Sequence, residues 1–385
     1  MLKKIIFLIS ILIISSCKEN QDSLLNEFQV ESSINYYKQI DDDKARMWLT
    51  DDNKIEGFAN NYKFHTENNF QTLSLLEVEN VNEIAFTNFS DMITHTPIKK
   101  EWHDNELEDK LAIKYSNNFG ESYFNTLHFD REFDFSTPDV SFQGTNEIQA
   151  LAFLNAQKGW LINYRHCDYC LKDDDEFQIY SIVNGEIKLV YKLTYWNHNF
   201  PNIKVIDAAF INSETGYVLY KEDYDPIQVG IIYNGGKDFG IGYNLPYSYG
   251  SLNKIKPLTE DIILAYNFGL GSAQLFRSEN RAKDWEKIQC NCDRFTELQF
   301  INATTGFMLC NSDSYNANNI GKNNILKTTD SGKTWVQINE KVVYGNTIHF
   351  KDELNGIAYG SGIIQKTKDG GKSWELLVFP PNVHL

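Results

Sequence analysis

The chain has 385 residues, of which 42% are hydrophobic and 14% are aromatic, and its formal net charge at pH 7 is −16. Such a charge repels nucleic-acid phosphates and anionic lipid headgroups, so it argues against nucleic-acid binding. A single hydrophobic core stops growing near about 250–300 residues, so the length indicates a modular fold. Short apolar runs, rich in aromatic residues and separated by Asn, Asp and Gly, favour an all-β protein.

The first seventeen residues resemble a bacterial lipoprotein signal. Lys3 and Lys4 precede an apolar run, Ile5–Ile14, that is too short to cross a bilayer. The run is followed by Ser15-Ser16-Cys17, which resembles a lipobox, in which the cysteine is acylated and becomes the mature N-terminus. We expect residues 1–17 to be the signal peptide and the lipid on Cys17 to hold the protein at the cell envelope, on the periplasmic or the surface face of the outer membrane. The alternative is an ordinary signal peptide cleaved nearby, with Cys17 incidental.

Residues 18–35 are polar without a clear period and are expected to form a tether, and residues 36–385 repeat one pattern. In its strict form the pattern is Phe-x-[Asn/Asp]-x-x-x-Gly followed by a large apolar residue. Strict copies begin at Phe153, Phe210, Phe300 and Phe350, and fainter ones at Ile40, Phe86 and Leu258. Each copy predicts the end of a strand, a tight polar turn with Gly at an unusual backbone angle, and a new strand.

A second pattern, [Ser/Thr]-x-Asp-x-Gly-x-x-Trp, follows most of these copies. The complete examples are Thr328-Asp330-Gly332-Trp335 and Thr367-Asp369-Gly371-Trp374; Ser278-Asn280-Trp285 is a decayed example, and weaker ones begin at Ser116 and Ile232. Hydroxyl and carboxylate groups at this spacing hydrogen-bond to the backbone of a hairpin turn, and the aromatic residue returns to the sheet. These turns resemble Asp-boxes, also called BNR repeats, which occur in sialidase-like β-propellers. We interpret them as structural and not as catalytic.

Seven units of about 50 residues, each with room for four short strands, predict a seven-bladed β-propeller with four-stranded antiparallel blades. Six blades are the alternative, if the unit near Ile40 is only a leader. Three units contain long insertions, which are Lys99–Lys110, His166–Glu176 and Asn311–Asn324.

The two patterns together, as in Phe300 to Gly306 followed by Thr328 to Trp335, resemble the Ycf48/Hcf136-like family of photosystem II assembly factors, which are WD40/YVTN-like repeat propellers. The resemblance implies a seven-bladed, non-enzymatic protein that binds partner proteins while a membrane complex is assembled. It is strong in the last two units and fades towards the N-terminus. It also implies a basic patch for partner binding, but the six arginines are scattered, so the photosynthetic role is not carried over.

Cysteines suggest disulfides and not a metal site. Beyond Cys17, the chain has Cys167, Cys170, Cys290, Cys292 and Cys310. We expect a possible disulfide between Cys167 and Cys170 within an inserted loop; with His166 the pair could also be half of a zinc site, which lacks further ligands. Neighbouring blades are expected to bring Cys310 to Cys290 or Cys292. The acidic run Asp173–Glu176 is interpreted as a solvated loop and not as a calcium site, and we expect no metal and no cofactor.

Two function classes remain open. The first is a non-catalytic, lipid-anchored propeller that binds a protein partner or an envelope glycan or other polymer, for example as an assembly or scaffold factor. The second is a sialidase-like glycoside hydrolase, which requires three converging arginines, a Tyr with a Glu partner and an acidic Asp. Arg277 and Arg281 flank a decayed turn, which is normally remote from such a site. We therefore favour the first class and expect no catalytic residue.

Overall fold

The computed structural model describes residues 46–377, with gaps that fall mainly between strands, the longest being 117–124, 167–174 and 312–321. Side chains of residues 74–147 are not described. The described residues form mainly β-strands and the turns between them, with one short 3₁₀ helix, η1 (Asn234–Gly236). None of the helical residues described forms a segment long and apolar enough to cross a membrane.

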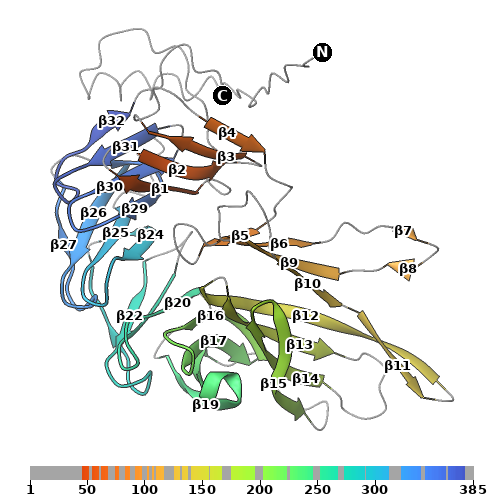
Figure 1. Cartoon of the computed structure of the whole chain (residues 1–385). Coiled ribbons are helices and arrows are strands. Elements are labelled where there is room, and N and C mark those ends of the chain that lie inside the picture. The colour runs from red at the N-terminus through yellow and green to blue at the C-terminus, as the bar shows by residue number, and fades with distance from the viewer. Residues whose placement is uncertain are drawn as a thin grey trace, which may run out of the picture. The chain divides into compact units, whose positions relative to one another are not determined.

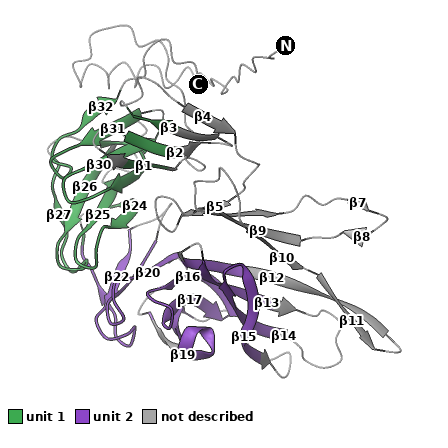
Figure 2. Ribbon diagram, viewed as in Figure 1, with its two compact units in different colours: residues 1–77, 269–272, 290–385 green, residues 78–268, 273–289 purple. Residues whose placement is uncertain are grey.

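The chain divides into two compact units (Figure 2). Unit 1 contains residues 1–77, 269–272 and 290–385, and unit 2 contains residues 78–268 and 273–289. Figure 1 shows the strands of both units and labels many of them.

Unit 2 contains four sheets of four or five strands in its described part, and one two-stranded ribbon. The first sheet has the order β10 (Asn125–Asp130), β9 (Lys110–Ser116), β6 (Met92–Pro97) and β5 (Glu83–Phe86), and the ribbon pairs β7 (Trp102–His103) with β8 (Glu106–Leu107). The second sheet is β11 (Glu132–Thr137), β12 (Val140–Asn155), β13 (Lys158–His166), β14 (Asp175–Val183) and β15 (Glu186–Tyr195). The third is β16 (Ile203–Phe210), β17 (Gly216–Glu222), β18 (Gln228–Tyr233) and β19 (Asp238–Asn244), and the fourth is β20 (Lys254–Pro257), β21 (Ile263–Tyr266), β22 (Leu275–Ser278) and β23 (Glu286–Lys287).

Unit 1 contains three sheets in its described part. The N-terminal sheet is β1 (Arg46–Asp51), β2 (Lys54–Ala59), β3 (Tyr62–Thr66) and β4 (Ser74–Glu77). The next is β24 (Arg294–Phe300), β25 (Gly306–Asn311), β26 (Lys322–Thr328) and β27 (Val336–Gln337), with β28 (Val343–Tyr344) also paired to β26. The C-terminal sheet is β29 (Thr347–Phe350), β30 (Gly356–Gly360), β31 (Ile363–Thr367) and β32 (Glu375–Leu377).

Each four-stranded sheet is an antiparallel meander, so its connections alternate between its two ends. We call the strands A, B, C and D in chain order, with β12 as strand A of the five-stranded sheet in unit 2. The A–B and C–D connections then lie at one end of each sheet, the turn end, and the B–C connection lies at the other, the loop end. The all-β fold predicted from composition and repeats is confirmed.

The Gly that recurs in the first pattern makes room for the Phe that begins the pattern. Gly306 pairs with Phe300 across the A and B strands, and an added Cβ would lie 2.8 Å from the Phe300 ring. The same distance is 2.7 Å at Gly216 and 2.8 Å at Gly356. None of these three glycines has a positive φ. The expectation of an unusual backbone angle was therefore wrong, and the reason for Gly is the close approach of a ring.

Aromatic rings also join neighbouring sheets within each unit. Trp160 of β13 stacks on Phe210 of the next sheet, and Phe307 of β25 stacks on Phe350, with ring centroids 3.6 Å apart in both pairs. The edge of Trp335 packs on Phe300 at 6.0 Å within one sheet. Phe210, Phe300 and Phe350 thus each contact both their own Gly and an aromatic ring, which explains why these residue types recur together.

One repeat position differs from the one expected. In the fourth sheet of unit 2, the residue that pairs across the A–B turn is Pro257, opposite Ile263, and not Leu258. The amide of Leu258 instead donates to the carbonyl of Ile262, as Ile211 does to Thr215 and Ile301 to Thr305. The expected anchor at Ile40 lies outside the described residues, and the first A–B turn described runs from Leu49 to Ile55.

The N-terminal sheet packs against the C-terminal sheet in unit 1. Met47, Leu49 and Ile55 share a buried cluster with β30 and β31 residues, among them Ile357 and Tyr359. The amide of Met47 donates a hydrogen bond of 3.0 Å to the Tyr359 hydroxyl, 312 positions away in the sequence. The two ends of the folded chain are therefore held together by apolar burial and by a buried hydrogen bond.

One disulfide joins Cys292, just before β24, to Cys310 in β25, with Cα atoms 5.4 Å apart. Both residues belong to one sheet, so the expectation that neighbouring blades bring the pair together was wrong. The pairing arises because β24 and β25 are antiparallel neighbours, which places the start of one beside the end of the other.

Candidate functional site

The turn end of the sheets carries the Asp-containing turns predicted from the sequence. In Thr328–Trp335, the Thr328 hydroxyl donates to Asp330 at 2.8 Å and accepts from the amide of Gly332 at 3.0 Å. Asp330 accepts from the Thr334 amide at 2.9 Å and from its hydroxyl at 2.6 Å. The Trp335 indole donates to the Gly332 carbonyl at 3.1 Å, which fixes the ring against the turn.

The same bonds recur in two further turns. In Thr367–Trp374, Asp369 accepts from the amide and the hydroxyl of Ser373 at 3.0 and 2.5 Å, and Trp374 donates to the Gly371 carbonyl at 3.0 Å. In the decayed turn, Asn280 accepts from the Asp284 amide at 2.9 Å, and Trp285 donates to the Ala282 carbonyl. The amide oxygen of Asn280 thus does the work of the Asp carboxylate.

Gly332 and Gly371 of the complete turns have φ values of 78° and 90°. Ala282 stands at the equivalent position of the decayed turn with a φ of 63°. An L-residue at positive φ is strained. The decayed turn therefore keeps its shape at a cost in backbone conformational energy that glycine would not have.

In five of the sheets, the C–D turn is also tied to the A–B turn of its own sheet by one backbone hydrogen bond. The five bonds described are Asn184 to Gln157, Gly235 to Glu214, Arg281 to Asp261, Ser331 to Thr304 and Gly370 to Leu354, where the amide is named first. The A–B turns are in turn closed by a side chain that accepts two amides, as Asn302 does from Thr304 and Thr305. The turn end is therefore held by local bonds within each sheet.

The electrostatics of Asp330 and Asp369 agree with this arrangement. Partial burial by itself raises the pKa of Asp330, but hydrogen bonds from Thr334 and Thr328 outweigh it and hold the pKa below its ordinary value. In the same way, bonds from Ser373 and Thr367 outweigh the effect of burial and lower the pKa of Asp369. Both side chains are thus held as carboxylates, which suits hydrogen-bond acceptors and not a general acid at neutral pH.

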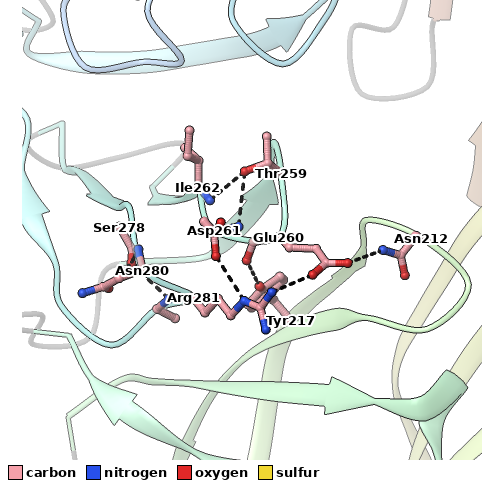
Figure 3. A network of polar contacts seen from close by, with 10 residues as sticks. Asn212, Tyr217, Thr259, Glu260, Asp261, Ile262, Ser278, Asn280 and Arg281 are labelled. Carbon is pink, nitrogen blue, oxygen red and sulfur yellow. Dashed lines mark hydrogen bonds and ion pairs between the residues drawn. The ribbon is translucent and has the colours of Figure 1, made fainter.

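A polar network links two neighbouring sheets of unit 2 at the turn end (Figure 3). Arg281, between β22 and β23, donates to Asp261 at 3.1 Å and to Glu260 at 2.9 Å. Glu260 also accepts from the side-chain amide of Asn212, in the A–B turn of the preceding sheet, at 3.0 Å. Hydrogen bonding to Asp261 and the nearby carboxylates raise the pKa of Arg281, which therefore remains a cation.

Tyr217 completes this network, because its hydroxyl donates to the backbone carbonyl of Glu260. Burial raises the pKa of Tyr217 to about 12. A neutral phenol that is buried and bonded to a carbonyl is a poor nucleophile. The cluster contains the residue types of a sialidase site, but its geometry is that of a clamp between two sheets.

The loop end of unit 2 carries a second set of polar side chains, which the sequence analysis did not identify. Asn163 of β13 donates to Gln178 of β14 at 3.0 Å, and Tyr220 of β17 donates to Gln228 of β18 at 2.9 Å. In the next sheet, the Gln274 amide donates to the side chain of Asn267 at 2.7 Å. Each pair joins the end of strand B to the start of strand C.

The loop-end pair of the five-stranded sheet extends into an ion pair between Glu176 and Lys192. Gln178 donates to Glu176 at 2.6 Å, and Glu176 accepts from Lys192 of β15 at 2.7 Å. The Tyr180 hydroxyl donates to Gln178 at 2.8 Å. Glu176 is buried while Lys192 is half exposed, so the network runs from the interior of the sheet to its surface. The loop-end positions could have been found from spacing. Asn163, Tyr220 and Asn267 each lie four residues after the strand B residue that faces the end of strand A, which is Gly159, Gly216 or Ile263.

Several predicted residues lie outside the described part of the chain. These are Cys17, Cys167 and Cys170, and most of the turn that begins at Ser116. The Ile232 turn is described and contains η1, with positive φ at Gly235 and Gly236. Among the described residues, no cluster of three or more His, Cys, Asp or Glu side chains could hold a metal ion.

Comparison with known proteins finds no matching family model and no matching curated protein. Among solved structures, Ycf48 from Cyanidioschyzon merolae is similar, with a TM-score of 0.50 and 10% identity over 87% of this chain and 97% of that chain. A structure of Ycf48 bound to a D1 peptide has a TM-score of 0.44 and 11% identity over 77% of this chain and 80% of that one. The GH74 xyloglucanase from Xanthomonas campestris has a TM-score of 0.47 and 9% identity, with 84% of this chain matching 51% of the enzyme.

At these identities, structural similarity establishes the fold and nothing further. The Cyanidioschyzon merolae structure matches over nearly its whole length, and the antiparallel sheets repeat along the chain. The chain therefore has a β-propeller fold similar to that of Ycf48.

Proposed function

We propose that this protein is a non-catalytic β-propeller that binds a protein partner through the loop ends of its sheets. The observation that carries the proposal is that the two ends of the sheets differ: one end is built from hydrogen-bonded turns, and the other carries the insertions. At the turn end, the Asp and Asn side chains are used in turn hydrogen bonds. The three long insertions of the sequence all connect strands B and C, so the topology assigns them to the loop ends.

Loops carried by a rigid scaffold are the usual place for recognition, because they vary without disturbing the core. The turn ends provide that scaffold through repeated local bonds. An assembly or scaffold role follows if one partner is held while it is built into a larger complex. This role agrees with the resemblance of the repeats to the Ycf48/Hcf136-like family, and an envelope glycan is the alternative ligand.

We propose a ring of seven blades. The described residues form seven sheets of four or five strands, and the N-terminal sheet packs against the C-terminal sheet within unit 1. Such packing is what closes a propeller and covers the faces that a single blade would expose.

The arginines do not favour the sialidase alternative. Arg281 is held by Glu260 and Asp261, and Arg277 by Glu279. A sialidase needs arginines whose charge is directed to the carboxylate of the substrate. Two of the six arginines are instead paired with carboxylates of this chain at the turn end.

Affinity capture from solubilised envelope tests the binding proposal. The full chain is compared with a variant in which residues 312–321 are replaced by a Gly-Ser linker, and with Asp330→Ala, which alters the turn end of the same sheet. We expect one specific protein to be captured by wild type and Asp330→Ala and to be lost with the linker variant, while circular dichroism shows that all three are folded. Loss with Asp330→Ala alone, or hydrolysis of sialosides or xyloglucan at enzyme-like rates, would overturn the proposal.

We further propose that Cys17 is lipidated and that the protein lies at the bacterial cell envelope. The apolar run before Ser15-Ser16-Cys17 supports export, and the Cys292–Cys310 disulfide suits an oxidising compartment. Cys17→Ser removes the sulfur that would be acylated. The variant should incorporate no palmitate analogue and should either remain an uncleaved precursor or appear in the soluble fraction. Normal processing with membrane retention after a high-salt wash would contradict lipidation.

A further inference from the structure

Three cysteines gather at the loop end of the β24–β27 sheet in unit 1. Cys292 and Cys310 form the disulfide, and Cys290 precedes Cys292 by two residues. Cys290 is partly exposed and carries a thiol, whereas Cys310 is buried. A thiol and a disulfide so close in the chain are the two reactants of thiol–disulfide exchange.

The backbone keeps Cys290 close to the disulfide. The amide of Cys292 donates to the carbonyl of Cys290 at 2.8 Å. The next residue, Asp293, donates its amide to the carbonyl of Asn311 at 3.1 Å, which holds the segment beside the end of β25. Cys290 is therefore tied by a backbone hydrogen bond to Cys292, the residue that forms the disulfide with Cys310.

We propose that Cys290 and Cys292 are alternative disulfide partners of Cys310. The Cys290 thiolate attacks the Sγ of Cys310, a Cys290–Cys310 bond forms, and the Cys292–Cys310 bond breaks. The electron pair of the broken bond goes to the Cys292 sulfur, which takes up the proton that Cys290 released. One disulfide and one thiol are present before and after the step, so no oxidant or reductant is consumed.

The exchange would change which cysteine links the segment before β24 to Cys310 of β25. This disulfide lies near the end of β25, and the 312–321 insertion follows β25 in the sequence. If the disulfide moves from Cys292 to Cys290, the path of the segment before β24 changes. The pairing of β24 with β25, which begins at Arg294, is kept. The site is thus a switch between two disulfide pairings, and it lies where an inserted loop begins.

Disulfide mapping of three variants tests the proposal. Cys292→Ser leaves Cys290 and Cys310, Cys290→Ser leaves the bond described here, and the double variant Cys290→Ser/Cys292→Ser leaves Cys310 alone as a matched control. Each folded protein is equilibrated in a glutathione redox buffer, quenched with acid, alkylated and mapped by mass spectrometry without reduction. For Cys292→Ser we expect a Cys290–Cys310 linked peptide and loss of alkylation at both residues, whereas the double variant should be alkylated or glutathionylated at Cys310.

Wild-type protein provides a second measurement that does not depend on a variant. At mildly alkaline pH, where more thiolate is present, alkylation should label both Cys290 and Cys292, because exchange transfers the thiol between them. Acid quenching before alkylation should show both linked peptides. Detection of the Cys292–Cys310 peptide alone in wild type, or alkylation of both Cys290 and Cys310 in folded Cys292→Ser, would overturn the proposal.

Discussion

Asp330 and Asp369 illustrate how single residues shape this protein. Each carboxylate accepts hydrogen bonds from the amide and the hydroxyl of a residue four positions later. Asn280 shows which part of the side chain is essential, because its single oxygen still accepts the amide of Asp284. One acceptor oxygen is therefore enough to form the turn, and the second oxygen of Asp adds a bond to the hydroxyl.

Asp330→Ala should lower the free energy of unfolding by about 1–2 kcal/mol, because the Thr334 amide and hydroxyl lose their acceptor. Asp330→Asn is the matched control and should lose less, because it keeps one oxygen, as Asn280 does. Urea denaturation followed by circular dichroism measures both. Equal losses for Ala and Asn would show that the turn depends on charge and not on the acceptor.

The stabilisation from Asp330 should also depend on pH. Its pKa in the folded protein lies below the ordinary value, so the folded state favours the carboxylate. This contribution is complete above the unfolded pKa, about 3.9 for Asp, and is lost as pH falls through the lower folded value. The difference in unfolding free energy between wild type and Asp330→Ala should shrink as pH is lowered from neutral to below about 3. A difference that grows with acidification would contradict the assignment.

At the scale of secondary structure, the repeated element is a hairpin whose Phe ring lies on a glycine. The ring of Phe300 occupies the space above Gly306 and meets the edge of Trp335. Where no Phe begins the hairpin, the facing residue is not Gly, as in the pairs Leu49–Ile55 and Pro257–Ile263. In the strict copies, the glycine thus makes room for the ring and is not needed for an unusual backbone angle.

Gly306→Ala should lower the free energy of unfolding by about 1–3 kcal/mol, because the new Cβ forces the Phe300 ring from its place. Gly240→Ala in β19 is the control, since its Cβ would lie 3.3 Å from the exposed Tyr233 ring, which can move. Thermal denaturation compares the two variants. The double variant Phe300→Leu/Gly306→Ala should recover part of the loss, and failure to recover would mean that Gly306 serves another purpose.

On the scale of the whole molecule, the chain is joined end to end within unit 1. β1 contributes Met47 and Leu49 to a cluster with Ile357 and Tyr359 of the C-terminal sheet. The Tyr359 hydroxyl accepts the Met47 amide in a buried setting, where an unmade hydrogen bond is costly. Closure in this way makes the stability of the last sheet depend on residues near the start of the fold.

Tyr359→Phe should lower the free energy of unfolding by about 1–2 kcal/mol, since the Met47 amide remains buried without its acceptor. The first sheet should also open more often and become more sensitive to limited proteolysis. Asp330→Ala serves as the control, because it destabilises a turn without touching β1. If both variants show the same cleavage pattern, the Met47–Tyr359 bond does not hold the first sheet in place.

Features that depend on neighbours in the chain could be predicted from the amino-acid pattern. Composition and the two repeats predicted an all-β propeller, because strands and turns follow from residue patterns only a few positions long. The Thr328 and Thr367 turns could be located to the residue, since all their side-chain bonds lie within eight positions. The identity of a binding partner is not encoded in such local patterns, because the repeats specify the scaffold and not the loops.

Contacts between residues far apart in the sequence are seen only in the tertiary structure. It paired Cys292 with Cys310 in one sheet, placed Arg281 beside Glu260 and Asp261, and joined Met47 to Tyr359. It also showed that Gly306 is required by the Phe300 ring and not by its backbone angle. These contacts depend on strand register and on the packing of one sheet against the next, and neither is set by any local pattern of residues.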